Sequence, residues 1–88
     1  MFKVKIITPK GVYGEIDATI LNVQTPDGMR GILSNHMPLV TMLKDGQMTI
    51  ANDQGTIPYR YNYHNGQGIL YFQENLATVL VDAIEKTN

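Results

Sequence analysis

The sequence has no cysteine, no tryptophan and no long apolar run among its 88 residues. The absence of cysteine excludes a disulfide framework and a thiolate metal site. Every apolar run falls short of the ~18–20 residues that cross a bilayer as a helix. The opening residues, MFKVKII, are too short and too charged for a signal peptide. We therefore expect a protein of the reducing cytoplasm with neither a signal peptide nor a transmembrane segment.

Charge is also scarce in this chain. Charged residues make up 17% of the sequence, the seven Lys and Arg residues are dispersed, and the net charge is −1. A nucleic-acid-binding surface needs clustered Lys and Arg, so the composition argues against that class of protein. The apolar content of 43% is ordinary for a globular protein, and 88 residues suffice for one domain only.

Short alternating segments separated by turn residues are abundant instead. Phe2, Val4 and Ile6 alternate with lysines, which is the period of a half-buried strand. Turn signals such as Pro26-Asp27-Gly28 recur along the chain, and no amphipathic helix of useful length appears. The sequence predicts an all-β fold, a flattened antiparallel β-sandwich of about ten short strands. The sandwich domain is expected over residues 1–84, followed by a polar tail over residues 85–88.

The strand pattern also predicts local features of burial and pairing. Residues Asp17–Thr25 are β-rich throughout and predict a single strand. Residues Val12–Ile16 predict a short edge strand, whereas the almost wholly apolar Leu39–Leu43 predicts a strand buried on both faces. Asp45-Gly46 predicts a hairpin between two apolar strands, and Glu74-Asn75 predicts another tight hairpin.

Four methionines lie in or beside the segment from residue 28 to residue 48. Methionine fills irregular gaps in cores and is also common at adaptable contact surfaces. Met42 and Met48 fall in predicted strands, so we expect them to fill the core. Met29 and Met37 fall in predicted loops, where an exposed contact with a partner is the better interpretation.

Few residues offer catalytic or ligand chemistry. His36 and His64 are the only histidines and show no ligand spacing, so we expect no metal site and no cofactor. Ser34, the only serine, shares a turn with His36, and a hydrogen bond within that turn is their expected role. A small hydrolase that uses this pair is the weakest alternative. The protein is therefore expected to act by contact and not as an enzyme.

An aromatic stripe is a second feature with two interpretations. Tyr59, Tyr61 and Tyr63 alternate along one face of a predicted strand, with Arg60 on the opposite face. We favour a place in the sandwich core or in a protein interface. The alternative function is a small single-stranded nucleic-acid-binding β-barrel, in which the tyrosines would stack on bases.

The segment from residue 28 to residue 46, GMRGILSNHMPLVTMLKDG, resembles the epsilon subunit of F-type ATP synthases, called delta in mitochondria. That family carries a pattern close to G-x-x-G-I-x-P-G-H-A-P-L-L-T-x-L-K-x-G, which aligns here without a gap. The similarity extends to TPKG and GE near the start and to QGILYF and ATVLVD near the end. Ser34 and Asn35 replace the family's Pro-Gly, and Met29 and Arg30 replace an acidic and an apolar residue.

The resemblance implies a non-catalytic subunit of the rotor, in the central stalk. Such a subunit links the gamma subunit to the membrane c-ring and couples ion-driven rotation to ATP synthesis. By residue-wise correspondence, Asp27, Gly28, Met29 and Arg30 would face the c-ring, and Thr8, His36 and Thr41 would face the gamma subunit. The implied location is peripheral, at the cytoplasmic face of the cell membrane, with membrane contact only through the complex.

The family usually continues beyond the sandwich with a two-helix C-terminal domain that carries inhibitory and nucleotide-sensing behaviour. The present sequence ends after the predicted sandwich. We therefore expect neither behaviour from these residues.

Overall fold

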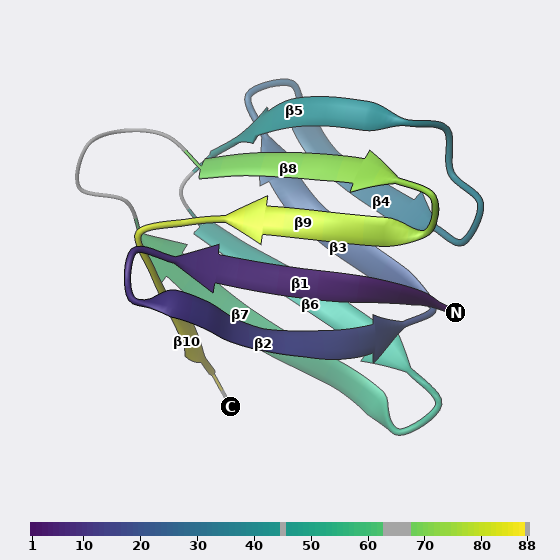
Figure 1. The fold of residues 1–88 in the computed structure, drawn as a ribbon, viewed down its shortest axis with the longest axis horizontal. Coiled ribbons are helices and arrows are strands. Elements are labelled where there is room, and N and C mark those ends of the chain that lie inside the picture. Colours follow the sequence, from purple (N-terminus) through teal and green to yellow (C-terminus); the bar gives the residue numbers. More distant parts are fainter. Residues whose placement is uncertain (45, 63–67, 88) are drawn as a thin grey trace.

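The computed structural model describes residues 1–44, 46–62 and 68–87, and these contain ten strands and no helix. The strands form two five-stranded sheets that pack face to face, as Figure 1 shows. The strands are β1 (Phe2–Thr8), β2 (Gly11–Ala18), β3 (Ile20–Thr25), β4 (Gly28–Leu33), β5 (Leu39–Leu43), β6 (Gly46–Asn52), β7 (Gly55–Asn62), β8 (Gly68–Gln73), β9 (Leu76–Leu80) and β10 (Ala83–Lys86). The predicted all-β sandwich of about ten strands is thereby confirmed.

Sheet A has the strand order β2-β1-β9-β8-β5, and sheet B has the order β10-β7-β6-β3-β4. Every neighbouring pair is antiparallel except β1 and β9, which run parallel in the middle of sheet A. On one side of the sandwich β5 packs over β3, and on the other β2 packs over β6. The edge strands β4 and β5 therefore share one side, and β2 and β10 lie toward the other.

The core lies between the two sheets and is built by the alternation seen in the sequence. Successive side chains of a strand point to opposite faces, so every second residue of β1 enters the core. Phe2, Val4 and Ile6 are almost completely buried, and the ring of Phe2 meets Phe72 edge to face at 5.5 Å. Sheet B contributes Leu21 and Ile50 among other fully buried side chains.

The chain crosses from sheet A to sheet B within a segment that the sequence predicted to be one uninterrupted strand. The single strand expected over Asp17–Thr25 is wrong, because the chain leaves sheet A after Ala18 and enters sheet B at Ile20. Thr19 fixes this crossing, since its backbone N–H and its hydroxyl both donate to the carbonyl oxygen of Ala51, at 2.7 Å and 3.0 Å.

The hairpin predicted at Asp45-Gly46 is also wrong, because β5 belongs to sheet A and β6 to sheet B. The backbone N–H of Lys44 donates to the carbonyl oxygen of Gln24, at 2.9 Å, and so ties the end of β5 to the end of β3. Gly46 starts β6 with a φ of +151°, a conformation that favours glycine. The chain does reverse direction here, but it moves from sheet A to sheet B and does not form a hairpin within one sheet.

Strand β5 is not buried on both faces as predicted. It forms an edge of sheet A, and the side chains of Val40 and Met42 are 67% and 45% exposed on its outer face. The expectation that Met42 fills the core is wrong for the same reason, whereas Met48 is buried as expected. A run of apolar residues therefore does not distinguish a central strand from an edge strand whose outer face is also apolar.

Other local predictions are confirmed. Strand β2, which contains Val12–Ile16, is the other edge of sheet A. Glu74 and Asn75 join β8 and β9 with φ values of +52° and +58°, the left-handed conformation of a tight hairpin turn. Glu85 and Lys86, expected in the polar tail, pair with β7 as part of β10.

Candidate interaction surfaces

The outer face of sheet A, the face turned away from sheet B, carries a continuous row of apolar side chains. Residues paired across neighbouring strands share a face. The pairings of all five strands therefore align Met42, Ile69, Leu80, Ile7 and Val12 in one row. Val40 and Tyr71 form the start of the next row, beside Met42 and Ile69. Except for the half-buried Ile7, these side chains are exposed, so the face is apolar without being covered.

The sequence signal for this face lies in β8 and was missed. In ILYFQ, the residues Leu70 and Phe72 enter the core, but the intervening Ile69 and Tyr71 are also apolar. A strand with only one buried face alternates apolar with polar residues. The loss of that alternation was the available indication that the second face is apolar too.

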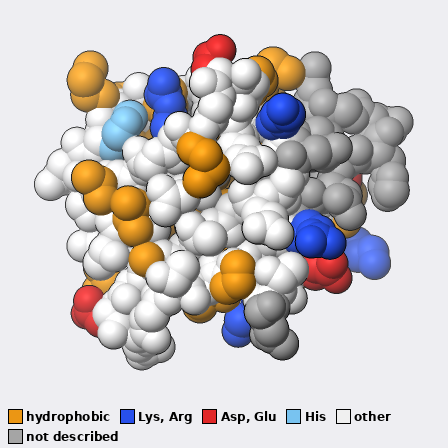
Figure 2. Space-filling view, turned by 180° about the vertical axis from the view of Figure 1, so that it is seen from behind, with side chains coloured by type: hydrophobic (Ala, Val, Ile, Leu, Met, Phe, Trp, Pro, Cys, Tyr) orange, Lys and Arg blue, Asp and Glu red, His pale blue; other side chains and the backbone are white. Residues whose placement is uncertain are grey.

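The outer face of sheet B is more polar, although Ile20 and the exposed Leu33 pair on it where β3 meets β4. Figure 2 shows this face as mostly uncharged polar side chains and backbone, with scattered apolar atoms. Asn22 on β3 donates from Nδ2 to the hydroxyl of Thr49 on β6 at 3.3 Å. Gln47, Arg60 and Glu85 follow one another across β6, β7 and β10 on the same face.

Of the residues predicted to face the c-ring, Asp27 lies in the turn between β3 and β4, and Gly28, Met29 and Arg30 are the first residues of β4. Thr25 organises this turn, because its hydroxyl accepts from the backbone N–H of Asp27 at 3.2 Å and donates to the carbonyl oxygen of Gly28 at 2.8 Å. Gly28 has a φ of +117°, and Met29 is 67% exposed. An open hollow of about 260 Å³ lies between this turn and Lys44. The expectation that Met29 lies in a loop is therefore wrong, because it pairs with Gln24 in β4, but its side chain is exposed as expected.

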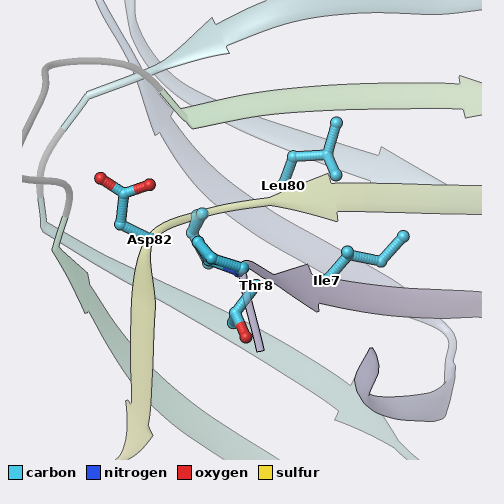
Figure 3. A pocket seen from close by; sticks show the side chains of 6 residues that line it. Ile7, Thr8, Leu80 and Asp82 are labelled. Atoms are coloured by element: carbon cyan, nitrogen blue, oxygen red, sulfur yellow. The ribbon is translucent and has the colours of Figure 1, made fainter. Parts of the chain in front are cut away.

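Thr8, one of the three residues predicted to face the gamma subunit, closes the turn from β1 to β2. Its hydroxyl accepts from the backbone N–H of Lys10 at 3.2 Å and lies 3.4 Å from the carbonyl oxygen of Gly11, to which it donates. It also lines an open hollow of about 280 Å³ at the ends of β1 and β9. Figure 3 shows Ile7, Thr8, Leu80 and Asp82 around this hollow.

His36 and Thr41, the other two predicted residues, lie on the side of the sandwich that carries β4 and β5. The His36 ring sits edge-on to Phe72 at 5.8 Å, and its Nδ1 lies 2.7 Å from the carbonyl oxygen of Met37. Thr41 is half-buried in β5. Thr8 is separated from β5 by β9 and β8, so the structure does not gather the three residues into one cluster.

The geometry of His36 bears on the hydrolase alternative. A ring nitrogen that donates to a main-chain carbonyl is orienting the ring. The backbone N–H of His36 likewise donates to the carbonyl oxygen of Leu33, at 3.2 Å. His36 is therefore a turn residue, as predicted, and it packs on Phe72. Its hydrogen bonds among the described residues go to Leu33 and Met37 and not to Ser34, the expected partner. His64 lies outside the described residues.

Two features are absent from the described part of the chain, a cluster of metal ligands and a membrane-spanning helix. Within residues 1–44, 46–62 and 68–87, no three His, Cys, Asp or Glu side chains converge as a metal site. Among the same residues, the structure has no helix long and apolar enough to span a bilayer.

Tyr59, the first residue of the aromatic stripe, is buried and packs edge-on against Tyr13 at 6.3 Å. Burial and, to a lesser degree, the neighbouring Tyr13 raise the pKa of Tyr59 above its ordinary value. Tyr13 reaches sheet B because the register of β1 and β2 shifts beside it, between Ile6 and Ile7. A buried Tyr59 cannot stack on a nucleic-acid base, which leaves the core interpretation for this residue. Tyr63 lies outside the described residues.

Fold and surfaces together define a small β-sandwich that offers an apolar face, a fixed turn and an apolar edge to other molecules. Residues 1–87 match the family model described as ATP synthase, Delta/Epsilon chain, beta-sandwich domain. The chain belongs to this family. It is 32% identical over 84 residues to the ATP synthase epsilon chain of Roseiflexus sp. (strain RS-1). The aligned residues make up 96% of this chain and 58% of the Roseiflexus chain.

Two solved structures share the fold. A chain of the Euglena gracilis mitochondrial ATP synthase (OSCP/F1/c-ring, rotational state 1) superposes with a TM-score of 0.82 at 13% identity. The match covers 94% of this chain and 51% of the Euglena chain. A chain from the central stalk and c-ring of the Tetrahymena thermophila mitochondrial ATP synthase gives a TM-score of 0.67 at 15% identity, covering 94% and 64% of the two chains.

Proposed function

We propose that this chain is a non-catalytic rotor subunit of an F-type ATP synthase. In this role it links the gamma subunit to the membrane c-ring, so that ion-driven rotation of the ring turns the central stalk during ATP synthesis. The observation that carries the proposal is the family match over residues 1–87, which is the whole sandwich. A close-packed sandwich suits the role, because transmission of torque requires stiffness between two contact surfaces.

The c-ring would meet Asp27 in the β3–β4 turn and Gly28, Met29 and Arg30 at the start of β4. The hydrogen bonds of Thr25 brace this turn, and Met29 adds an exposed apolar side chain beside it. Asp27 and Arg30 supply charges of both signs, so a ring loop that combines apolar and charged residues would be complementary.

The gamma subunit would meet His36 and Thr41 on the side of β4 and β5. Thr8 lies at the same end of the sandwich as the turn at Asp27. The pairings of sheet A align the end of β1 with the end of β5, and Lys44 after β5 bonds to Gln24 near the end of β3. We therefore assign Thr8 to the part of the gamma interface nearest the ring. The sandwich would then touch gamma along one side and the ring at one end.

The subunit would carry no cofactor and no catalytic group of its own. It would be peripheral at the cytoplasmic face of the cell membrane and would reach the membrane only through its complex. Contact with gamma would engage side chains and backbone already ordered in the sandwich, without a rearrangement of its core.

Co-purification of the tagged chain with its gamma subunit and c-ring tests the proposal. We expect both partners to be recovered with the chain, and failure to recover gamma would overturn the proposal. Arg30→Glu is expected to weaken c-ring recovery about tenfold while gamma is retained, because it reverses a charge at the ring-facing turn. Arg60→Glu, the same change on the outer face of sheet B, is the matched control and should leave both partners bound.

A further inference from the structure

Two asparagines tie the loop between β4 and β5, residues 34–38, to a turn that is distant in the sequence. The loop carries His36, and the hydrogen bonds of His36 are local, to residues 33 and 37. Among residues 1–44, 46–62 and 68–87, the hydrogen bonds that join this loop to a segment distant in sequence both run between Asn35 and Asn75. Figure 1 shows the β4–β5 connection and the β8–β9 turn at the same end of the sandwich.

The two hydrogen bonds are reciprocal. The backbone N–H of Asn35 donates to Oδ1 of Asn75 at 2.7 Å, and Nδ2 of Asn75 donates to Oδ1 of Asn35 at 3.1 Å. The turn that holds Asn75 is itself anchored, because the backbone N–H of Lys3 donates to the carbonyl oxygen of Asn75 at 3.1 Å. The loop is therefore fastened to the central part of sheet A, where β1 and β9 pair.

Both asparagines adopt a backbone conformation that few side chains tolerate. Their φ values are +64° at Asn35 and +58° at Asn75, in the left-handed region that glycine and asparagine enter most readily. Glycine would supply the conformation without the amide group, whereas asparagine supplies both. Ser34-Asn35 also stands where the family pattern has Pro-Gly, so no proline ring restricts the backbone at position 34. The asparagine pair supplies a restraint on the loop in its place.

We infer that Asn35 and Asn75 are a positioning pair for the contact with the gamma subunit. Their hydrogen bonds hold the β4–β5 loop in the arrangement that presents His36, whose ring packs on Phe72 at 5.8 Å. The pair acts without touching gamma, because a loop that is ordered beforehand loses less conformational freedom on association. The inference rests on the proposed function for the role of His36.

Amide exchange in the free chain tests whether the pair restrains the loop. Asn75→Gly removes the side chain and accepts the left-handed backbone conformation. We expect the backbone amide of Asn35 to exchange about tenfold faster in this variant, because its acceptor is lost. Asn75→Asp keeps an acceptor oxygen and should retain most of the protection. The amide of Thr19, which donates to Ala51, is the internal reference and should exchange at an unchanged rate.

Affinity for the purified gamma subunit tests whether the restraint serves binding. Asn75→Gly should weaken gamma binding about fivefold, because only the fraction of the chain with the loop in place is competent to bind. Asn75→Asp, which keeps one of the two hydrogen bonds, should weaken it about twofold at most. Glu74→Gly is the matched control, since Glu74 is the exposed neighbour in the same turn, with a φ of +52° and a side chain outside the pair. It should leave binding unchanged, and urea midpoints verify that the variants are folded.

A double-mutant cycle separates positioning from a general structural role. His36→Ala is measured in the unsubstituted chain and in Asn75→Gly. If the pair acts through the loop that carries His36, the loss caused by His36→Ala should be clearly smaller in the Asn75→Gly background. Losses that simply add would show that Asn75 does not act through His36, and would overturn the inference.

The outcomes also separate the inference from the function on which it rests. If gamma binds Asn75→Gly as tightly as the unsubstituted chain, the positioning role is wrong and the rotor function stands. Unchanged exchange of the Asn35 amide in Asn75→Gly would likewise overturn the restraint without bearing on the rotor function. If gamma does not bind the unsubstituted chain, the proposed function and this inference fall together.

Discussion

The two outer faces of this sandwich differ although the two sheets bury similar side chains between them. Sheet A turns an unbroken apolar row outward, from Met42 to Val12, whereas sheet B turns outward polar groups such as Asn22 and Thr49. Both sheets need an apolar inner face for folding. Neither needs an apolar outer face, so folding alone does not account for the apolar outer face of sheet A, which is a candidate contact surface.

The largest expected effects test whether the inner faces of the two sheets contribute equally to the free energy of unfolding. Leu70 of sheet A and Leu21 of sheet B are both fully buried. Leu70→Ala and Leu21→Ala should each lower the free energy of unfolding by about 2–5 kcal/mol, through lost apolar burial and the cavity left behind. Urea denaturation measures both. A cost for one substitution below about 1 kcal/mol would show that the sheets do not share one core.

A smaller effect is expected where the chain crosses from sheet A to sheet B. Gly46 has a φ of +151°, and a β-carbon there would meet the side chain of Gln24. Gly46→Ala should lower the free energy of unfolding by about 1–3 kcal/mol, mainly through backbone strain, since the Gln24 side chain can move aside. Gly14→Ala is the matched control, because its φ is not in the left-handed region and a β-carbon there meets nothing within 4 Å. Equal costs at both positions would contradict this account of the crossing.

The outer faces themselves should contribute little to folding and much to association. Leu80→Ser on sheet A should change the free energy of unfolding by about 1 kcal/mol or less, because Leu80 is already partly exposed. It should reduce the binding of an apolar dye and any self-association measured by sedimentation, since it interrupts the apolar row. Gln47→Ser on sheet B is the control that should alter neither. If the two substitutions behave alike, the difference between the faces has no consequence in solution.

The smallest effect concerns pH and the contact between Tyr13 and Tyr59 that joins the two sheets. The pKa of Tyr59 is raised from 10.0, chiefly by burial. A raised pKa in the folded protein means that the stabilisation is complete below pH 10.0 and is lost as the pH rises through the folded-state value. The free energy of unfolding should therefore decline more steeply above pH 10.0 in the unsubstituted protein than in Tyr59→Phe. Urea titrations on both sides of that pH measure the two slopes, and parallel slopes would contradict the prediction.

The sequence predicted the fold class because the alternation of β1 and the turn residues are local signals. It also predicted the hairpin at Glu74-Asn75 for the same reason. Met29 is exposed as predicted, but it lies in β4 and not in the loop from which its exposure was inferred. It failed where the answer depends on which layer a strand joins. The turn at Asp45-Gly46 reverses the chain, but turn chemistry does not specify whether the next strand pairs within the sheet or crosses to the other one.

The error at β5 has a different origin. An apolar run predicts burial, but burial can be supplied by another protein as well as by the chain itself. Val40 and Met42 are exposed, so the chain by itself does not bury this run. The residues assigned to c-ring and gamma contacts, such as Met29 and Thr41, came from family resemblance and stay predictions, because no property of the chain alone identifies the partner.

The parallel pairing of β1 with β9 has a consequence for how the protein is made. These two strands occupy the middle of sheet A, yet they come from opposite ends of the sequence, Lys3 lying beside Leu76 and Ile7 beside Leu80. A chain emerging from the ribosome can form the β1–β2 hairpin early, but its sheet cannot close until residue 80 has been synthesised. Long-range pairing of this kind folds slowly. The apolar strands made in the meantime keep their edges exposed, a state that favours aggregation until β9 pairs with β1.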